Sequence, residues 1–192
     1  MVELIVLAIG AATVACLVAF VATRRRRQMA GHPSPTFVFA DLVGYTALTE
    51  ERGDEAAARV AREFRRTMCA LSRAHGASQV KSMGDGVMIW IGDAGDGVSL
   101  AAETLERVGT RSDLLPVRIG VHTGPAVRRG GDWYGSAVNV AARLADQARP
   151  NEALVSEATW ATARCEHTKP VDTPRELVLR GLNRRVAALR LA

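Results

Sequence analysis

The sequence has few cysteines and few aromatic residues. Its three cysteines, Cys16, Cys69 and Cys165, lie far apart and are odd in number. This spacing argues against a disulfide framework and against a cysteine-based metal site, and it favours a reducing compartment. Aromatic residues make up only 5% of the chain, which argues against a surface that stacks nucleic-acid bases.

The chain carries a net positive charge but lacks a motif that would bind nucleic acid. The formal net charge is +5, but a good part of the excess is the run Arg24 to Arg27. No nucleic-acid-binding motif accompanies this charge, so a nucleic-acid partner is not expected. Hydrophobic residues make up 48% of the 192 residues, which is enough for the core of one ordinary domain with an appendage.

Residues 4–23, LIVLAIGAATVACLVAFVAT, contain no charged residue and no proline. About 20 residues at roughly 1.5 Å each span about 30 Å, the thickness of the hydrocarbon layer of a membrane. The arginines that follow indicate that this end stays in the cytosol. We therefore predict a single-pass membrane protein with a transmembrane helix over 1–23, a basic, proline-containing linker over 24–35, and a cytosolic remainder.

A cleaved signal peptide is the alternative interpretation of the same segment. The first three residues, MVE, carry no positive charge, the apolar run is long, and arginines follow it. Each of these features is atypical of a secretory signal peptide. The membrane anchor is therefore the favoured interpretation.

The hydrophobic periodicity of residues 36–192 predicts one domain of mixed strands and helices. The predicted strands are 36–40, 78–83, 86–91, 116–122 and 153–155, followed by a closing hairpin of 177–179 and 186–191. The predicted helices are 54–75, 96–108, 135–148 and 156–163. The order strand, helix, hairpin, helix, strand predicts an α+β fold, with an antiparallel or mixed sheet covered by helices on one face.

Two aspartates stand at the ends of predicted strands. Asp41 follows the first strand, and Asp85 lies in the turn between the second and third. Two carboxylates at adjacent strand ends repel each other and raise one pKa unless a cation lies between them. Mg²⁺ and Mn²⁺ suit such ligands and often complete their shell with water and phosphate, which points to a nucleoside triphosphate. Taken alone, Asp41 is better explained as a residue that caps a loop.

Four further polar residues are candidates for a site. Lys81 could be a surface charge paired with a nearby acid, and Asp132 follows two glycines, as a turn aspartate often does. Asn139 and Arg143 are four residues apart, so they share a helix face, and small apolar residues flank them. The planar, permanently charged guanidinium of Arg143 suits a phosphate group.

Four segments that contain these residues, FADLVGYT, KSMGDG, VRIGVHTG and GDWYGSAVNVAARL, follow one another in this order. In order and spacing they resemble the catalytic domain of class III nucleotide cyclases, over about residues 36–192. The resemblance implies a ferredoxin-like, palm-type βαββαβ core for this domain. It also implies an adenylyl cyclase, which converts ATP to 3′,5′-cyclic AMP and pyrophosphate by two-metal-ion catalysis at a dimer interface.

The resemblance implies a role for each candidate. Asp41 and Asp85 match the aspartates that hold two divalent ions, Mg²⁺ or Mn²⁺. Lys81 and Asp132 match the pair that reads the purine base. A lysine donor and an aspartate acceptor complement the ring nitrogen and amino group of adenine, whereas family members that use GTP generally carry residues such as Glu and Cys at these positions. The resemblance therefore favours ATP over GTP.

The resemblance also implies that each site is shared between two chains. Asn139 matches the residue that orients the ribose, and Arg143 matches the residue that stabilises the transferring phosphate. In the family one protomer supplies the metal-binding aspartates, and the other supplies the lysine, the second aspartate, the asparagine and the arginine. Because all six positions hold the residues of an active enzyme, a homodimer with two sites is expected.

One departure from the family pattern concerns a late lysine that binds the terminal phosphates. The corresponding region here is LRGLNRRVAALRL, in which Arg180, Arg184 or Arg185 is a possible substitute. The main alternative function is a catalytically silent pseudo-cyclase that acts as a dimerising nucleotide sensor or as one half of a heterodimer. A guanylyl cyclase is disfavoured by the base-reading pair, and a diguanylate cyclase would need a GGDEF-like hairpin where this chain has MGDGV.

Overall fold

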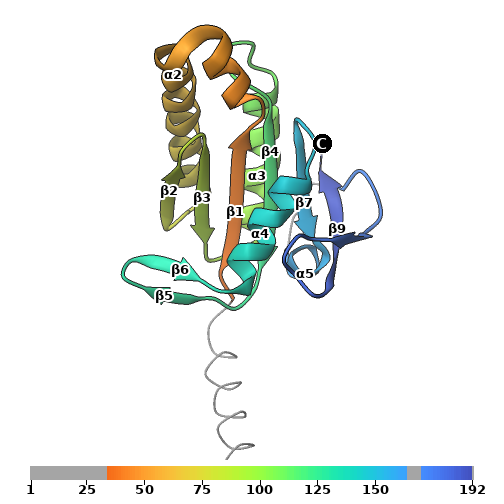
Figure 1. Ribbon diagram of the computed structural model, residues 1–192. Coiled ribbons are helices and arrows are strands. Elements are labelled where there is room, and N and C mark those ends of the chain that lie inside the picture. The colour runs from red at the N-terminus through yellow and green to blue at the C-terminus, as the bar shows by residue number, and fades with distance from the viewer. Residues whose placement is uncertain (1–33, 164–169, 192) are drawn as a thin grey trace, which may run out of the picture. The chain divides into compact units, whose positions relative to one another are not determined.

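The computed structural model describes residues 34–163 and 170–191 (Figure 1). The predicted transmembrane helix at 1–23, and all of the predicted linker except its last two residues, lie outside the described residues. Within the part of the chain that is described, no helix is long and apolar enough to cross a membrane.

The described chain alternates strands and helices. The strands are β1 (Thr36–Leu42), β2 (Gln79–Met83), β3 (Gly86–Ile91), β4 (Val117–Thr123), β5 (Val127–Arg129), β6 (Asp132–Tyr134), β7 (Glu152–Ser156), β8 (Arg175–Val178) and β9 (Arg185–Leu191). The helices are α2 (Tyr45–Ala74), α3 (Ala94–Gly109), α4 (Ser136–Gln147) and α5 (Glu157–Trp160).

One sheet of seven strands forms the centre of the fold, in the order β2-β3-β1-β4-β7-β9-β8. Its neighbours pair antiparallel except β4 and β7, which are parallel. The elements β1, α2, β2, β3, α3 and β4 form a βαββαβ unit with the strand order of a ferredoxin-like core. The predicted α+β class and mixed sheet are confirmed.

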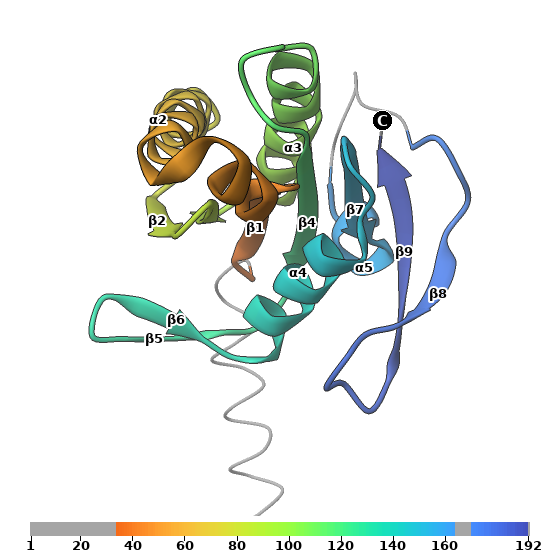
Figure 2. The ribbon, with the colours of Figure 1, turned by 45° about the horizontal axis from the view of Figure 1, so that its top comes forward.

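The prediction that helices cover only one face of the sheet is wrong. Successive residues of a strand point to opposite faces. Val38 and Ala40 of β1 pack in a core cluster with residues of α2 and α3, whereas Phe37 packs with Ala137 and Ala141 of α4. Figure 2 shows α4 on the side of the sheet away from α2 and α3. The physical reason is that β1 is apolar on both sides, so both of its faces need cover.

Helix α4 lies directly on strand β4. A Cβ atom built at Gly120 would lie 2.1 Å from the carbonyl oxygen of Ala141 and 2.3 Å from the nitrogen of Ala145. Only glycine permits this approach of two backbones. The contact fixes the position of α4 and of the polar residues that this helix presents.

Three local predictions differ from the structure. Helix α2 begins at Tyr45, before the predicted start at 54, and a kink at Gly53, with φ of +80°, divides it. Helix α5 ends at Trp160, well before the predicted end at 163. The short strands β5 and β6 form a hairpin on a separate sheet, and the prediction missed it. Their sequence is short and polar, so it has no hydrophobic alternation to detect.

Candidate active site

The sheet brings Asp41 and Asp85 together at one edge. Asp41 lies opposite Gly86 in the pairing of β1 with β3, and Asp85 directly precedes Gly86 in the β2–β3 turn. A Cβ atom at Gly86 would lie only 2.8 Å from Oδ1 of Asp41. A glycine is therefore required beneath this carboxylate, and both aspartates stand at neighbouring strand ends.

The carboxyl group of Asp85 has a raised pKa. Burial raises the pKa of this carboxyl, and the charge of Asp41 raises it further, against the opposing effects of a backbone hydrogen bond and of Arg118. Among the described residues no group of three or more His, Cys, Asp or Glu side chains could hold a metal ion. Two carboxylates alone fit a hard cation such as Mg²⁺, which commonly takes its other ligands from water and phosphates.

Sequence reasoning missed Arg118, which is the ion-pair partner of Asp41. Its Nε and Nη2 atoms donate to Oδ2 of Asp41 at 3.0 and 2.6 Å. The two residues lie opposite each other on β4 and β1. The segment VRIGVH could have indicated this arginine. Arg118 alternates with the apolar Val117 and Ile119, so its side chain leaves the strand on the face opposite to theirs.

Lys81 and Asp132 form an ion pair within one chain. Nζ of Lys81, on β2, donates to Oδ2 of Asp132, on β6. Oδ1 of Asp132 accepts a hydrogen bond from the backbone nitrogen of Trp133 at 2.9 Å. The hydrogen bond from Lys81 lowers the pKa of Asp132, and the Trp133 N–H adds to this effect. The lysine therefore pairs with this aspartate, and a half-exposed donor and acceptor stand side by side.

Asn139 and Arg143 lie on the exposed side of α4, while Val140 and Leu144, the residues that directly follow them, are fully buried. Nη1 of Arg143 donates to Oδ2 of Asp146 at 2.7 Å, one turn further along the helix. Within a single chain both candidate residues therefore face solvent. Neither contacts the aspartates at the ends of β1 and β2.

The turn between β8 and β9 lies against the same helix. Leu179 and Leu182 pack in one core cluster with Val140 and Leu144 of α4. The exposed residues Arg180, Arg184 and Arg185 belong to this turn or to its edge. The late segment therefore packs its leucines against the helix that carries Asn139 and Arg143, and its three arginines are exposed.

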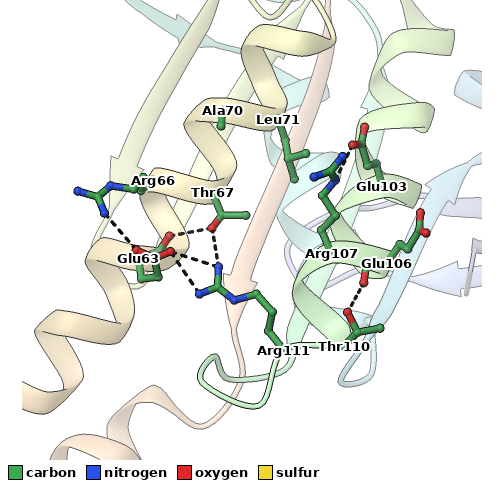
Figure 3. Close-up of a pocket in the computed structure, with 10 residues that line it drawn as sticks. All are labelled: Glu63, Arg66, Thr67, Ala70, Leu71, Glu103, Glu106, Arg107, Thr110 and Arg111. Carbon is green, nitrogen blue, oxygen red and sulfur yellow. Dashed lines mark hydrogen bonds and ion pairs between the residues drawn. The ribbon is translucent and has the colours of Figure 1, made fainter.

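A second charged region lies between α2 and α3, on the other face of the sheet (Figure 3). This groove has a volume of about 770 Å³. Nη1 and Nη2 of Arg111 each donate to Oε1 of Glu63 at 3.2 Å. Oε1 of Glu103 accepts from Nε of Arg107 at 2.7 Å, and its Oε2 contacts Nε2 of His75 at 2.6 Å. Glu63 and Glu103 are thus already paired, and the two close carboxylates at the sheet edge are the stronger candidate site.

Comparison with known families gives a match over residues 28–187 to the adenylate and guanylate cyclase catalytic domain. A pH-sensitive adenylate cyclase of Mycobacterium tuberculosis is 38% identical over 136 residues, which is 67% of this chain and 33% of that protein. An adenylate cyclase of Streptomyces griseus is 32% identical over 133 residues, 69% of this chain and 33% of that protein. The match thus spans about a third of the length of these curated relatives.

Solved structures of cyclases share the fold. Adenylate cyclases from Trypanosoma brucei in their monomeric state match with a TM-score of 0.76 and 21% identity, over 83% of this chain and 88% of that one. The adenylyl cyclase CyaB of P. aeruginosa matches with a TM-score of 0.68 and 22% identity, over 83% of this chain and 94% of that one. With the family match over most of its length, the chain belongs to the adenylate and guanylate cyclase catalytic domain family.

Proposed function

We propose that this protein is an adenylyl cyclase, which converts ATP to 3′,5′-cyclic AMP and pyrophosphate at sites shared between two copies of the chain. The observation that carries this proposal is the pair of carboxylates at one sheet edge, where burial and the charge of Asp41 raise the pKa of Asp85. Two close negative charges are costly unless a cation balances them. The curated relatives named as adenylate cyclases support the same function.

In this proposal Asp41 and Asp85 hold two divalent ions, Mg²⁺ or Mn²⁺. Such ions lower the pKa of a bound hydroxyl and neutralise charge on phosphate oxygens. The ribose 3′-hydroxyl of ATP loses its proton and attacks the α-phosphorus, and the bond to pyrophosphate breaks. Arg118 balances Asp41 at the same edge. Its guanidinium is therefore well placed to exchange that carboxylate for a triphosphate oxygen.

The Lys81–Asp132 pair supports adenine as the base. The Lys81 ammonium donates to the ring nitrogen of adenine, and the Asp132 carboxylate accepts from its amino group. Each group already has the other as a partner, so the pair is held in position before the base arrives. Guanine presents a carbonyl and a ring N–H instead, which would face the wrong partners.

Asn139 and Arg143 complete a site on a second copy of the chain. Both are exposed on α4, where they are available to a nucleotide bound at the aspartates of a partner. Asn139 orients the ribose. Arg143 donates to the phosphate oxygens as negative charge develops on them, so it acts mostly in the transition state. An arginine among Arg180, Arg184 and Arg185 replaces the late phosphate-binding lysine of the family.

We also propose that residues 1–23 anchor the protein in a membrane, with the catalytic domain in the cytosol. The uncharged run at 4–23 and the arginines that follow it support this location. Fractionation of cells that express the full chain tests the proposal. The protein should sediment with membranes and resist alkaline extraction, and a chain found in the supernatant would contradict the anchor.

The deciding experiment incubates the purified full chain with Mn²⁺ and either ATP or GTP, and separates the products by chromatography. Cyclic AMP from ATP is expected, with loss of the product in Asp85→Ala. Glu176→Ala is the matched control, because Glu176 is an exposed acid on the edge strand β8. Cyclic GMP as the main product would indicate a guanylyl cyclase. Bound ATP without product would favour the pseudo-cyclase, a nucleotide sensor or heterodimer half.

A further inference from the structure

We propose that Trp133 is a positioning residue for base recognition. Together with Phe37 and Trp90 it forms an aromatic cluster that docks the β5–β6 hairpin onto the main sheet. The docked hairpin brings Asp132 to Lys81 and so sets the preference for adenine. The inference rests on the proposed function for its consequence in catalysis, while the docking itself can be measured without any cyclase activity.

The β5–β6 hairpin needs side-chain contacts to hold its place. Each of its strands has three residues. Within the described part of the chain, the two pair only with each other and not with the seven-stranded sheet. An isolated two-stranded hairpin is marginally stable in water. The position of Asp132 therefore depends on what attaches the hairpin to the rest of the domain.

The aromatic cluster provides this attachment. Phe37 and Trp90 lie opposite each other on β1 and β3, and Phe37 is fully buried. The ring of Trp133 lies 5.7 Å from that of Phe37 at an interplanar angle of 71°, and 4.9 Å from that of Trp90 at 42°. Aromatic rings attract each other at such separations in edge-to-face or offset arrangements.

A cation strengthens the same attachment. Arg128 lies opposite Trp133 in the hairpin, so both side chains leave the same face. Its Cζ lies 5.8 Å from the ring centroid of Trp90, within the range of a cation–π contact. Both strands of the hairpin are thus joined to Trp90.

The docking determines where the base-reading carboxylate stands. Trp133 directly follows Asp132, and its backbone nitrogen donates to Oδ1 of that aspartate. Lys81 lies opposite Met88 on β3, two positions before Trp90 on the same face. The anchor of the hairpin and the partner of Asp132 therefore sit on adjacent strands. Loss of the ring contact would move the carboxylate relative to the lysine.

The structure suggests informative variants. Nε1 of Trp133 and Nε1 of Trp90 are buried and have no hydrogen-bond partner among the described residues. Ring contact, rather than an indole hydrogen bond, therefore holds the cluster, and Trp133→Phe should retain much of it. Trp133→Ala removes it. Tyr134→Ala is the matched control for docking, because Tyr134 is the next residue and its side chain is 57% exposed.

Limited proteolysis of the full chain measures docking directly. Arg128 and Arg129 are exposed trypsin sites in the hairpin. Because the ring contacts oppose local opening of the hairpin, cleavage there should accelerate about tenfold in Trp133→Ala, little in Trp133→Phe and not in Tyr134→Ala. The near-ultraviolet circular dichroism of the Trp90–Trp133 pair should disappear in Trp133→Ala. Unchanged cleavage and dichroism in Trp133→Ala would overturn the docking role.

Kinetics then test the consequence for the base. In Trp133→Ala the ratio of kcat/KM for ATP to that for GTP should fall about tenfold, mainly through KM for ATP, and Trp133→Phe should restore most of it. A general folding defect would instead lower kcat/KM for ATP and for GTP by the same factor. That result would overturn the role in base recognition. A wild-type chain that forms no cyclic nucleotide would refute the proposed function, while proteolysis and dichroism would still decide the docking.

Discussion

The two charged regions of this domain lie on opposite faces of the sheet and balance their charges differently. In the α2–α3 groove, Glu63 meets Arg111 and Glu103 meets both Arg107 and His75 (Figure 3). Glu63 and Glu103 thus each have a cationic or hydrogen-bonding partner in the same chain. The groove has a volume of about 770 Å³, but its carboxylates Glu63 and Glu103 are already paired.

At the sheet edge the balance is incomplete. Asp41 has Arg118, but Asp85 lies beside it with a raised pKa. Asn139 and Arg143 face solvent on α4. The comparison teaches that two close like charges mark a functional candidate: Asp85 lies beside Asp41 and its pKa is raised, whereas Glu63 and Glu103 each lie beside a cation.

The largest expected effect separates the two regions by activity. Asp85→Ala should lower kcat by about a thousandfold, because a group that stabilises transition-state charge commonly contributes 10²–10³. Glu63→Ala, in the groove, should leave kcat per folded molecule within about twofold, because it affects only an ion pair between helices. Rates of both variants, corrected for the folded fraction, test this. Equal losses would remove the distinction between the regions.

The next effect tests whether the sheet edge is completed by a second chain. Asp41→Ala and Arg143→Ala should each be nearly inactive. When the two variants are refolded together, half of the dimers contain one chain of each variant. Each of these dimers has one intact site of its two, so co-refolding should restore about a quarter of wild-type activity.

The matched control for this complementation is a mixture of Asp41→Ala with Asp85→Ala. Both aspartates belong to the same half of the shared site, so no mixed dimer of this pair contains an intact site. Absence of rescue in the Asp41→Ala and Arg143→Ala mixture, with mixed dimers demonstrated by differential tags, would refute the shared site. Rescue in the control mixture would refute it as well.

The sequence predicted the strand ends that carry the aspartates because local pattern determines them. The β1 segment is apolar up to the charged Asp41, one residue before its end, and the glycine turn joins β2 and β3. The resemblance to cyclases then supplied an expected role for each of the six candidate residues. Contacts between distant elements could not be predicted from the local sequence pattern. The Asp41–Arg118 pair depends on the register of β1 with β4. The position of α4 on the second face of the sheet depends on its contact with Gly120.

The β5–β6 hairpin was missed for a different physical reason. Its strands are short and exposed, with Gly130 and Gly131 between them at φ of +58° and +82°. Two glycines predict a turn but not the pairing that follows. The aromatic contacts of Trp133 fix this hairpin, and they join residues far apart in the sequence. The ion pair of Lys81 with Asp132 became visible only with this arrangement.

A smaller effect contrasts the two regions by stability. The folded-state pKa of Asp85 lies above its ordinary value, so its ionised form destabilises the fold at every pH above that pKa. Asp85→Asn should therefore raise Tm at pH 7.5 by about 1–2 °C, whereas Glu63→Gln should lower it by a similar amount through loss of an ion pair. Mn²⁺ should raise Tm of the wild type and of Glu63→Gln but not of Asp85→Asn. A lower Tm in Asp85→Asn would show that the carboxylate pair is already balanced.

The smallest effect concerns the pH dependence of the groove. The hydrogen bond from His75 and the nearby Arg107 lower the pKa of Glu103. A depressed carboxyl pKa contributes stability that is fully present above the unfolded-state pKa and is lost as the pH falls through the folded-state value. Glu103→Gln should therefore lower Tm by about 1–2 °C near neutral pH and by nothing at a pH below the folded-state pKa of Glu103. Thermal melts of both proteins across this range measure the difference. Because the groove lies on the face of the sheet away from Asp41, the ratio of ATP to GTP turnover should stay unchanged in Glu103→Gln, and a changed ratio would connect the groove to the site.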